Sequence, residues 1–308
     1  MPLSDEKVNS IFLGCDLLDI KIDDYRQKHG TFGIPEFGTS FTRQMLDDTK
    51  PEKFSALIRI AGFSHGTDVW INNAHDFILN GDATMDDAIA TRDDIMNYLI
   101  EKGLPKQDAF SIMEHVRKGK GLKDDEVLLM QENNVPEWYI ESCRRIKYMF
   151  PKAHAVAYVM MSYRIAYFKV YYPQEFYATY FTMKVEFFNT AVIMQGMDAV
   201  TARMDAIKLA GDEASNKEKD EYIIYEVVYE MYARGYEFLP ARLGNSQALK
   251  FSVEDGKVRL PFRALEGMGE TAASSLVDEY EKQYFTSEQD IMGRNASAFC
   301  IYAWPFSI

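Results

Sequence analysis

The chain has 308 residues, 47% of them hydrophobic and 14% aromatic, which is enough for about two or three domains with buried cores and argues against global disorder. Its net charge of −13 means that any contact with nucleic acid must come from a local cluster of cations. Three cysteines without a CxxC pair argue against a disulfide framework, and no stretch is apolar enough to span a membrane. Without a signal-peptide pattern, a cytoplasmic location is expected.

Hydrophobic periodicity predicts a mainly α protein with one small β element. A loop rich in glycine is expected over 30–38, and a helical pattern starts at Thr39. Pro51 suits the first turn of the next helix, because its missing N–H would be unpaired there anyway. Around Asp255-Gly256, alternating residues predict a hairpin within 250–262. The other helices are expected over 51–61, 84–101, 105–116, 151–171, 173–183, 198–209 and 221–233, with a turn that enters a helix over 264–281.

Cations gather where the longest apolar helix is expected to begin, in the stretch "IKYMFPKAHAVAY" over 146–158. A helix N-terminus attracts anions, so Lys147, Lys152 and His154 around it predict a phosphate site. The alternative interpretation is an apolar helix with cations at its ends that serve only solubility. Spacing places further residues on or beside the same face as His154, where a base would stack. They are Tyr158, Ser162 and Arg164.

The turn "GFSHGTDVW" over 62–70 holds Ser64, His65 and Asp68. These residue types make up hydrolytic triads, but three residues this close in one loop seldom converge. Ligand contact, or capping of the following helix by Ser64 or Asp68, is therefore expected instead of catalysis.

The stretch "LEGMGE" over 265–270 has the form of a glycine hairpin between helices. Such hairpins hold DNA through backbone N–H groups without reading bases. An ordinary helix-capping turn is the alternative, and Glu266 and Glu270 would repel phosphate. No Asp-x-Asp pair is present to hold a pair of metal ions, and no GxxxxGK[ST] loop supports an independent nucleotide hydrolase.

Long stretches of the chain match a known family in order and spacing. They are "GTFGIPEFGTSFTRQML", "IAGFSHGTDVW", "RDDIMNYLI", "VRKGKGL", "VPEWYIESCRRIKYMFPKAHAVAYVMMSYRIAYFKVYYP" and "LPFRALEGMGE". Together they resemble the C-terminal third of a bacterial replicative DNA polymerase III α subunit of the PolC type, from about residue 8 to about residue 294.

This resemblance implies a domain layout. Residues 1–30 would connect to the palm, which carries the catalytic aspartates upstream, and 31–190 would be the fingers that bind the incoming dNTP. Residues 195–294 would be the helix-hairpin-helix region that holds DNA. The last segment, 295–308, lacks the family's clamp-binding peptide and reads as an atypical tail, which puts sliding-clamp binding in doubt.

The resemblance also implies roles for individual residues, none of them catalytic. The dNTP would be bound by Ser64, His65, Gly66, Arg144, Arg145, Lys147, Lys152, His154, Tyr158, Ser162 and Arg164. DNA would be bound by Arg117, Lys118, Lys120, Gly267, Met268 and Gly269. Mg²⁺ would serve the full enzyme through ligands outside this chain, and the partners would be primer-template DNA, dNTP and the palm and thumb.

Two hypotheses of different classes remain open. The chain is expected to be a fragment of a DNA-directed DNA polymerase that is inactive alone, because it lacks the carboxylates that hold metal. The alternative is a stand-alone, non-catalytic DNA-binding module that uses only the hairpin region. A duplex binder has no need of a triphosphate pocket. Removing the fingers cations Lys152 and His154 should therefore leave duplex affinity unchanged if the second hypothesis holds.

Overall fold

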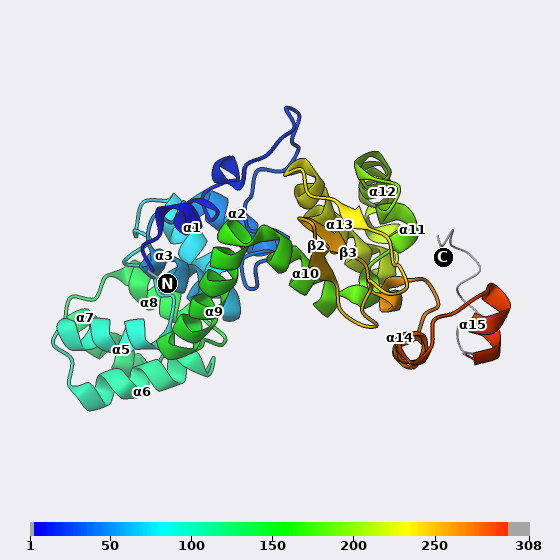
Figure 1. Ribbon diagram of the computed structural model, residues 1–308. Coiled ribbons are helices and arrows are strands. Elements are labelled where there is room, and N and C mark those ends of the chain that lie inside the picture. Colours follow the sequence, from blue (N-terminus) through cyan, green and yellow to red (C-terminus); the bar gives the residue numbers. More distant parts are fainter. Residues whose placement is uncertain (1–2, 295–308) are drawn as a thin grey trace. The chain divides into compact units, whose positions relative to one another are not determined.

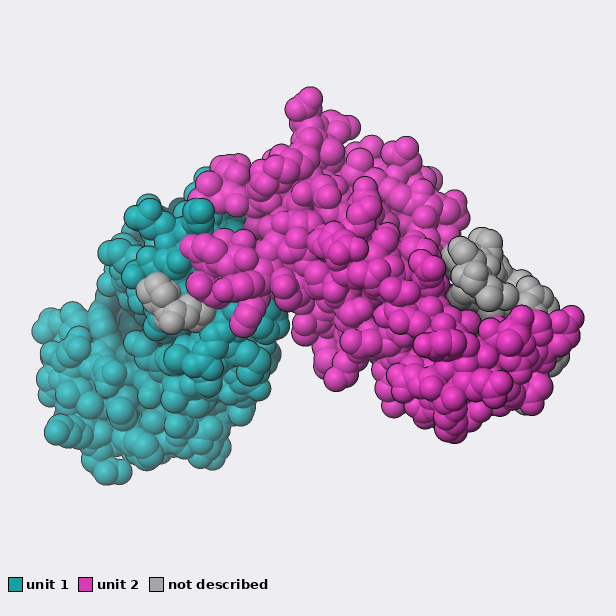
Figure 2. All heavy atoms as spheres, viewed as in Figure 1, with its two compact units in different colours: residues 1–14, 29–166 teal, residues 15–28, 167–308 magenta. Residues whose placement is uncertain are grey.

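Helices dominate residues 3–294, the part of the chain that the computed structural model describes (Figure 1). Within these residues the chain forms fifteen α-helices and a three-stranded sheet, which confirms the mainly α class predicted from the sequence. The chain divides into two compact units (Figure 2). Unit 1 comprises residues 1–14 and 29–166, and unit 2 comprises residues 15–28 and 167–308. The predicted tail over 295–308 lies outside the described residues.

Unit 1 is built from helices alone, apart from one isolated β-bridge in its described part. Its core includes the facing apolar sides of two neighbouring helices. Ile95 and Leu99 are fully buried, as are Ala109, Ile112 and Val116 at three- and four-residue spacing. The helices of unit 1 are α1 (Glu6–Ser10), α2 (Ser40–Thr49), α3 (Phe54–His65), α4 (His75–Leu79), α5 (Arg92–Glu101), α6 (Lys106–Arg117), α7 (Asp124–Glu132), α8 (Glu137–Arg145) and most of α9 (Lys152–Tyr171).

Unit 2 combines helices with the small sheet. Its remaining elements are α10 (Pro173–Met183), α11 (Thr190–Ile193), α12 (Met197–Ala210), α13 (Asn216–Ala233), β1 (Phe238–Leu239), β2 (Ser252–Glu254), β3 (Lys257–Arg259), α14 (Glu270–Lys282) and α15 (Glu288–Arg294). The strand order is β1-β3-β2, with β1 parallel and β2 antiparallel to β3. Asp255 (φ 50°) and Gly256 (φ 77°) form the turn between β2 and β3, so the predicted hairpin is confirmed.

A buried polar cluster lies in the core of unit 2. The Lys169 ammonium lies 2.8 Å from the Glu230 carboxylate, and both side chains are fully buried. The Tyr177 hydroxyl donates to Glu230 (2.8 Å) and accepts from the Arg234 guanidinium (3.1 Å). Burial lowers the pKa of Lys169 to about 8. The cluster links α9, α10 and α13 and pairs the buried Glu230 carboxylate with a buried cation.

Several predicted helix bounds were wrong. The helix expected over 84–101 begins only at Arg92, because the Asp94 carboxylate accepts from the backbone N–H groups of Ala90 (3.1 Å) and Thr91 (2.9 Å) and so caps α5 there. Pro51 does not lie in a first turn, since α3 begins at Phe54 and runs on to His65.

Other helices were missed from the sequence. The region between 118 and 150 contains α7 and α8, which were not predicted. The helix expected over 221–233 begins earlier, at Asn216. A capping box explains the earlier start: Ser215 Oγ accepts from the Glu218 N–H (3.3 Å), and the Glu218 carboxylate accepts from the Ser215 N–H (2.9 Å).

Candidate functional site

Two predicted stretches of unit 1 meet through backbone pairing. The Thr67 N–H donates to the Tyr148 carbonyl (2.8 Å), and the Lys147 N–H donates to the Thr67 carbonyl (3.1 Å). Gly66 permits this approach, because a Cβ at that position would lie 2.7 Å from the Tyr148 carbonyl oxygen. The pairing brings the end of α3 next to the segment that leads into α9.

Four rings gather where these segments meet. His154 stacks on Phe150 with centroids 4.6 Å apart and an angle of 19° between the planes. His65 lies 5.1 Å from His154, and Tyr158 lies 4.6 Å from His154 on the next turn of α9. Three of these residues, His65, His154 and Tyr158, were predicted to lie in one site, and the structure places them together. Phe150 was not predicted, although it lies within the same stretch.

Glu36 holds the ring of His65. Its Oε2 lies 2.6 Å from His65 Nε2, and His65 Nδ1 is buried with no hydrogen-bond partner among the described residues. Glu36 belongs to the glycine-rich loop over 30–38 and has a left-handed φ of 68°. No sequence pattern points to this contact, because the two residues are 29 positions apart and the loop has no periodic pattern.

The triad and capping interpretations of the turn are not supported by its geometry. Ser64 and His65 lie in the last turn of α3, not in a loop. The Ser64 hydroxyl donates to the Ala61 carbonyl (3.1 Å), whereas His65 contacts Glu36, so no Ser–His hydrogen bond forms. Asp68 has a left-handed φ of 55° and, like Ser64, does not cap the next helix.

The N-terminus of α9 carries its own carboxylate. Asp93 accepts a hydrogen bond of 2.6 Å from the Lys152 N–H, and the N–H groups of His154 (3.0 Å) and Ala155 (3.4 Å) donate to the Pro151 carbonyl. These bonds use backbone donors that the prediction had assigned to an anion. An anion here must therefore be held mainly by side chains.

Some of the predicted cations already pair with carboxylates, and the others form no ion pair with the described residues. Arg144 pairs with Glu137 (3.4 Å) and Glu141 (3.6 Å), and Arg145 pairs with Glu141 (3.1 Å). Arg145 also donates to the carbonyl of Asn72 (2.9 Å). These two arginines already have carboxylate partners that would compete with phosphate.

Arg117 and Lys118 share one carboxylate in the same way. Lys118 Nζ lies 2.7 Å from Glu114, and the Arg117 guanidinium donates to both oxygens of that carboxylate. These hydrogen bonds lower the pKa of Glu114 to about 2. The other four predicted cations are exposed and form no ion pair with the described residues; they are Lys120, Lys147, Lys152 and Arg164.

Ser162 is a correction to the predicted binding face of α9. Its side chain is fully buried, and its hydroxyl donates to the Tyr158 carbonyl (3.0 Å). The residue therefore packs inside unit 1 instead of facing a ligand. Tyr158 and Arg164 on the same helix are exposed, and their contact with a nucleotide stays a prediction.

The glycine hairpin of unit 2 leads into α14. Gly267 has a left-handed φ of 75°, and Gly269 directly precedes the helix, where a Cβ would meet open space. Met268 is buried, and its N–H donates to the Leu265 carbonyl (3.0 Å). The Met268 N–H is therefore not available to DNA, contrary to the prediction. Glu266 and Glu270 beside the hairpin are exposed.

Metal and membrane features were searched over residues 3–294. No group of three or more His, Cys, Asp or Glu side chains in this range could hold a metal ion. None of the helices described there is long and apolar enough to cross a membrane.

Comparison with known families defines the class of this chain. Residues 1–134 match the bacterial DNA polymerase III alpha subunit finger domain, and residues 235–299 match a helix-hairpin-helix motif. The first match contains the α3 turn with His65, and the second contains the glycine hairpin and α14. The chain thus combines a polymerase finger domain with a helix-hairpin-helix domain, as the resemblance implied.

Three relatives illustrate the similarity to individual proteins. The chain is 52% identical over 295 residues to DNA polymerase III PolC-type of Clostridium perfringens, which covers 96% of this chain and 20% of that protein. It is 48% identical over 294 residues to the PolC-type enzyme of Caldanaerobacter subterraneus and 47% identical over 294 residues to that of Thermotoga maritima, each with 96% of this chain and 21% of the relative covered. The chain is therefore homologous to PolC-type DNA polymerase III and spans about a fifth of the length of these relatives.

Proposed function

We propose that this chain is the part of a C-family replicative DNA polymerase that binds the incoming dNTP and the DNA backbone. The observation that carries the proposal is the meeting of His65, His154 and Tyr158 beside two exposed lysines, Lys147 and Lys152, within unit 1. The similarity to PolC-type polymerases over 96% of the chain supports the same assignment.

The chemistry of the proposed nucleotide site follows from these side chains. A triphosphate carries several negative charges, and the lysine ammonium groups offset that charge while pyrophosphate leaves. The rings of His154 and Tyr158 offer flat faces on which a base can stack. Glu36 orients the His65 ring beside them.

The DNA contacts are proposed at two places. In unit 2, Gly267 and Gly269 let a phosphate approach the start of α14 closely. In unit 1, Lys120 is the exposed cation of the "RKGK" segment that has no carboxylate partner among the described residues, whereas Arg117 and Lys118 contact Glu114.

Mg²⁺ is proposed as the metal of the whole polymerase. DNA polymerases transfer nucleotides with metal ions held by carboxylates. Residues 3–294 provide no such carboxylate group, so no metal-dependent step is assigned to them. We therefore expect this chain to need the palm and thumb of the polymerase as partners for nucleotide transfer.

The first test is dNTP binding, measured by isothermal titration of the whole chain. Lys147→Ala combined with Lys152→Ala should weaken binding by about tenfold or more, because two phosphate contacts are lost. Lys106→Ala is the matched control, since Lys106 is also exposed on unit 1 and forms no ion pair with the described residues. Equal affinity in all variants would overturn the proposed nucleotide site.

The second test is primer extension with Mg²⁺ and the four deoxynucleotides. The chain should be silent alone and active when mixed with a separately expressed PolC segment that carries the palm, and the lysine variant should reduce that activity. Extension by the chain alone would contradict the proposal that this chain needs the palm for nucleotide transfer. Duplex binding with no response to dNTP or to the lysine variant would instead indicate a stand-alone DNA-binding module.

A further inference from the structure

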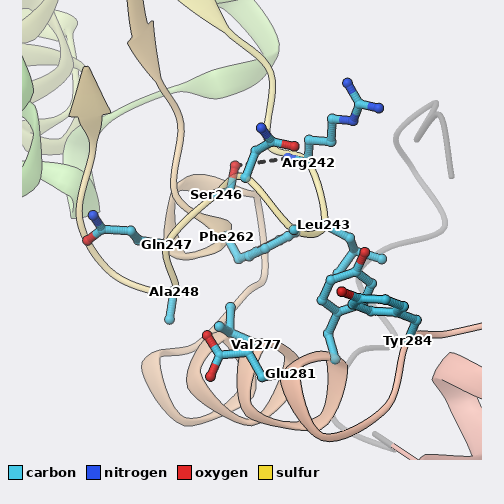
Figure 3. Close-up of a pocket in the computed structure, with 12 residues that line it drawn as sticks. Arg242, Leu243, Ser246, Gln247, Ala248, Phe262, Val277, Glu281 and Tyr284 are labelled. Carbon is cyan, nitrogen blue, oxygen red and sulfur yellow. Dashed lines mark hydrogen bonds between the residues drawn. The ribbon is translucent and has the colours of Figure 1, made fainter. Parts of the chain in front are cut away.

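A cavity of about 740 Å³ lies in unit 2, between the loop over 242–248 and the C-terminal half of α14 (Figure 3). Val277 and Glu281 on α14 and Tyr284 just after it line one side of this cavity. The glycine hairpin lies at the opposite end of the same helix. Twelve residues separate Gly269 from Glu281, which is about 18 Å along α14. One phosphate cannot reach both places, so the cavity is distinct from the proposed backbone site.

The loop side of the cavity is held in place by hydrogen bonds. Ser246 Oγ accepts from the Arg242 N–H (2.9 Å) and donates to the Leu260 carbonyl (2.7 Å). The Phe262 N–H donates to the Gln247 carbonyl (3.1 Å). Gly244 has a φ of 81°, and a Cβ there would lie 3.1 Å from the Tyr280 hydroxyl, so glycine lets the ring lie close to the loop. This side of the cavity is therefore formed before any ligand arrives.

The other side presents aromatic rings. Tyr284 is 72% exposed, an unusual exposure for so large a ring, and its centroid lies 4.9 Å from that of Tyr280. Tyr280 in turn contacts Phe285, which is buried. The buried ring of Phe285 thus packs against the half-buried ring of Tyr280, which packs against the exposed ring of Tyr284. The face of the Tyr284 ring is therefore open to solvent and can stack on a base.

Exposed polar side chains also line this cavity. The side chains of Arg242, Gln247 and Glu281 are exposed and form no hydrogen bond or ion pair with the described residues. Among the residues that line the cavity, Arg242 carries a positive charge and Glu281 a negative one. A duplex backbone needs several cations and no rings. A single nucleotide needs one cation for its phosphate, a ring for its base and acceptors for the base edge.

We infer that this cavity binds an unpaired nucleotide of single-stranded DNA. The base stacks on Tyr284, Arg242 contacts the adjoining phosphate, and Gln247 and Glu281 contact the polar edge of the base. The inference rests on the proposed function only in taking DNA as the ligand. It adds a second DNA site of a different kind to unit 2: the hairpin holds paired DNA by its backbone, and the cavity holds an exposed base.

The test compares two DNA probes on the whole chain by fluorescence anisotropy: a short labelled single strand, and the blunt duplex of the same sequence. Tyr284→Ala should weaken single-strand binding about tenfold and leave duplex binding unchanged, because only the single strand offers a free base face. Gly269→Asp should do the reverse, since its carboxylate repels the duplex backbone at the hairpin. Tyr172→Ala is the matched control, because Tyr172 is also a tyrosine of unit 2 and is 48% exposed.

The outcomes separate the two sites. Unchanged single-strand affinity in both Tyr284→Ala and Arg242→Ala would overturn the inference. Competition by a free mononucleotide as strong as that by the single strand would also overturn it, because the site would then take a single nucleotide instead of a strand. Failure of the wild-type chain to bind duplex, with single-strand binding intact and sensitive to Tyr284→Ala, would count against the proposed hairpin site and support the cavity. Circular dichroism melting of Tyr284→Ala should match the wild type, since the ring is exposed.

Discussion

At the scale of single residues, Gly66 decides whether the two halves of the candidate nucleotide site can meet. Its φ of −86° is open to any residue, so the need for glycine comes from space and not from backbone strain. The Tyr148 carbonyl and the Val69 side chain occupy the volume that a Cβ would take. The backbone pairing of Thr67 with Tyr148 depends on this close approach.

Gly66→Ala should therefore lower both stability and nucleotide affinity. The added methyl forces the Tyr148 segment away, at a cost of about 1–3 kcal/mol in the free energy of unfolding. Urea denaturation measures that cost, and dNTP titration measures the affinity. Gly269→Ala is the control for stability, because a Cβ there meets nothing within 4 Å. A Gly66→Ala chain as stable as the control would show that the pairing is not needed.

The sequence predicts some residues of the site better than others, for a physical reason. His65, His154 and Tyr158 belong to residue types and local spacings that suggest ligand contact, and the structure brings them together. Glu36 and Asp93 could not be predicted, because their contacts link positions 29 and 59 residues apart. The carboxylate partners of the arginines were overlooked although they lie only three to seven residues away along the chain. The burial of Ser162 was overlooked as well.

At the scale of elements, some helix starts follow the hydrophobic pattern and others are set by side-chain caps. The pattern places α6, α9 and α10 within one residue of their observed bounds, because their apolar faces run from end to end. It misplaces α5 and α13. Their first turns are polar, and carboxylates that accept backbone N–H groups fix their starts. The short helices α7 and α8 were missed because polar residues fill much of each.

Ser215→Ala should destabilise unit 2 through α13. Loss of the hydroxyl leaves the Glu218 N–H without its acceptor, which typically costs about 1 kcal/mol at a helix start. Thermal melting of the whole chain should show a lower Tm. Ser215→Thr keeps the hydroxyl and should retain most of the stability. Equal melting of the alanine and threonine variants would show that the cap does not contribute.

At the scale of the whole molecule, the chain crosses between the two units three times, after residues 14, 28 and 166. Residues 15–28 lie in unit 2, where Arg26 pairs with Asp205 (3.0 Å) and Tyr25 stacks on Tyr229. The sequence could not indicate this, because the segment has no periodic pattern. The domain boundaries predicted at residues 30 and 190 stay predictions.

Lys169→Met tests how much of unit 2 depends on its buried charges. The change leaves the Glu230 carboxylate buried without its cation, which should cost about 3–5 kcal/mol. Hydrogen exchange should accelerate in α10 and α13 and stay unchanged in α5 and α6, which belong to unit 1. Adding Glu230→Gln should restore much of the protection, since the unpaired charge is gone. Faster exchange throughout both units would contradict independent unfolding.

The path of residues 15–28 also has a consequence for synthesis on the ribosome. The Arg26 N–H donates to the Tyr229 hydroxyl, a partner that is made 203 residues later. At translation rates of about 5–20 residues per second, the early segment waits roughly 10–40 s for that partner. During this interval Tyr25 has no surface to stack on, so unit 2 cannot be completed until its last helices emerge. A nascent chain would thus expose residues 15–28 to chaperones well after residues 29–166 have been translated.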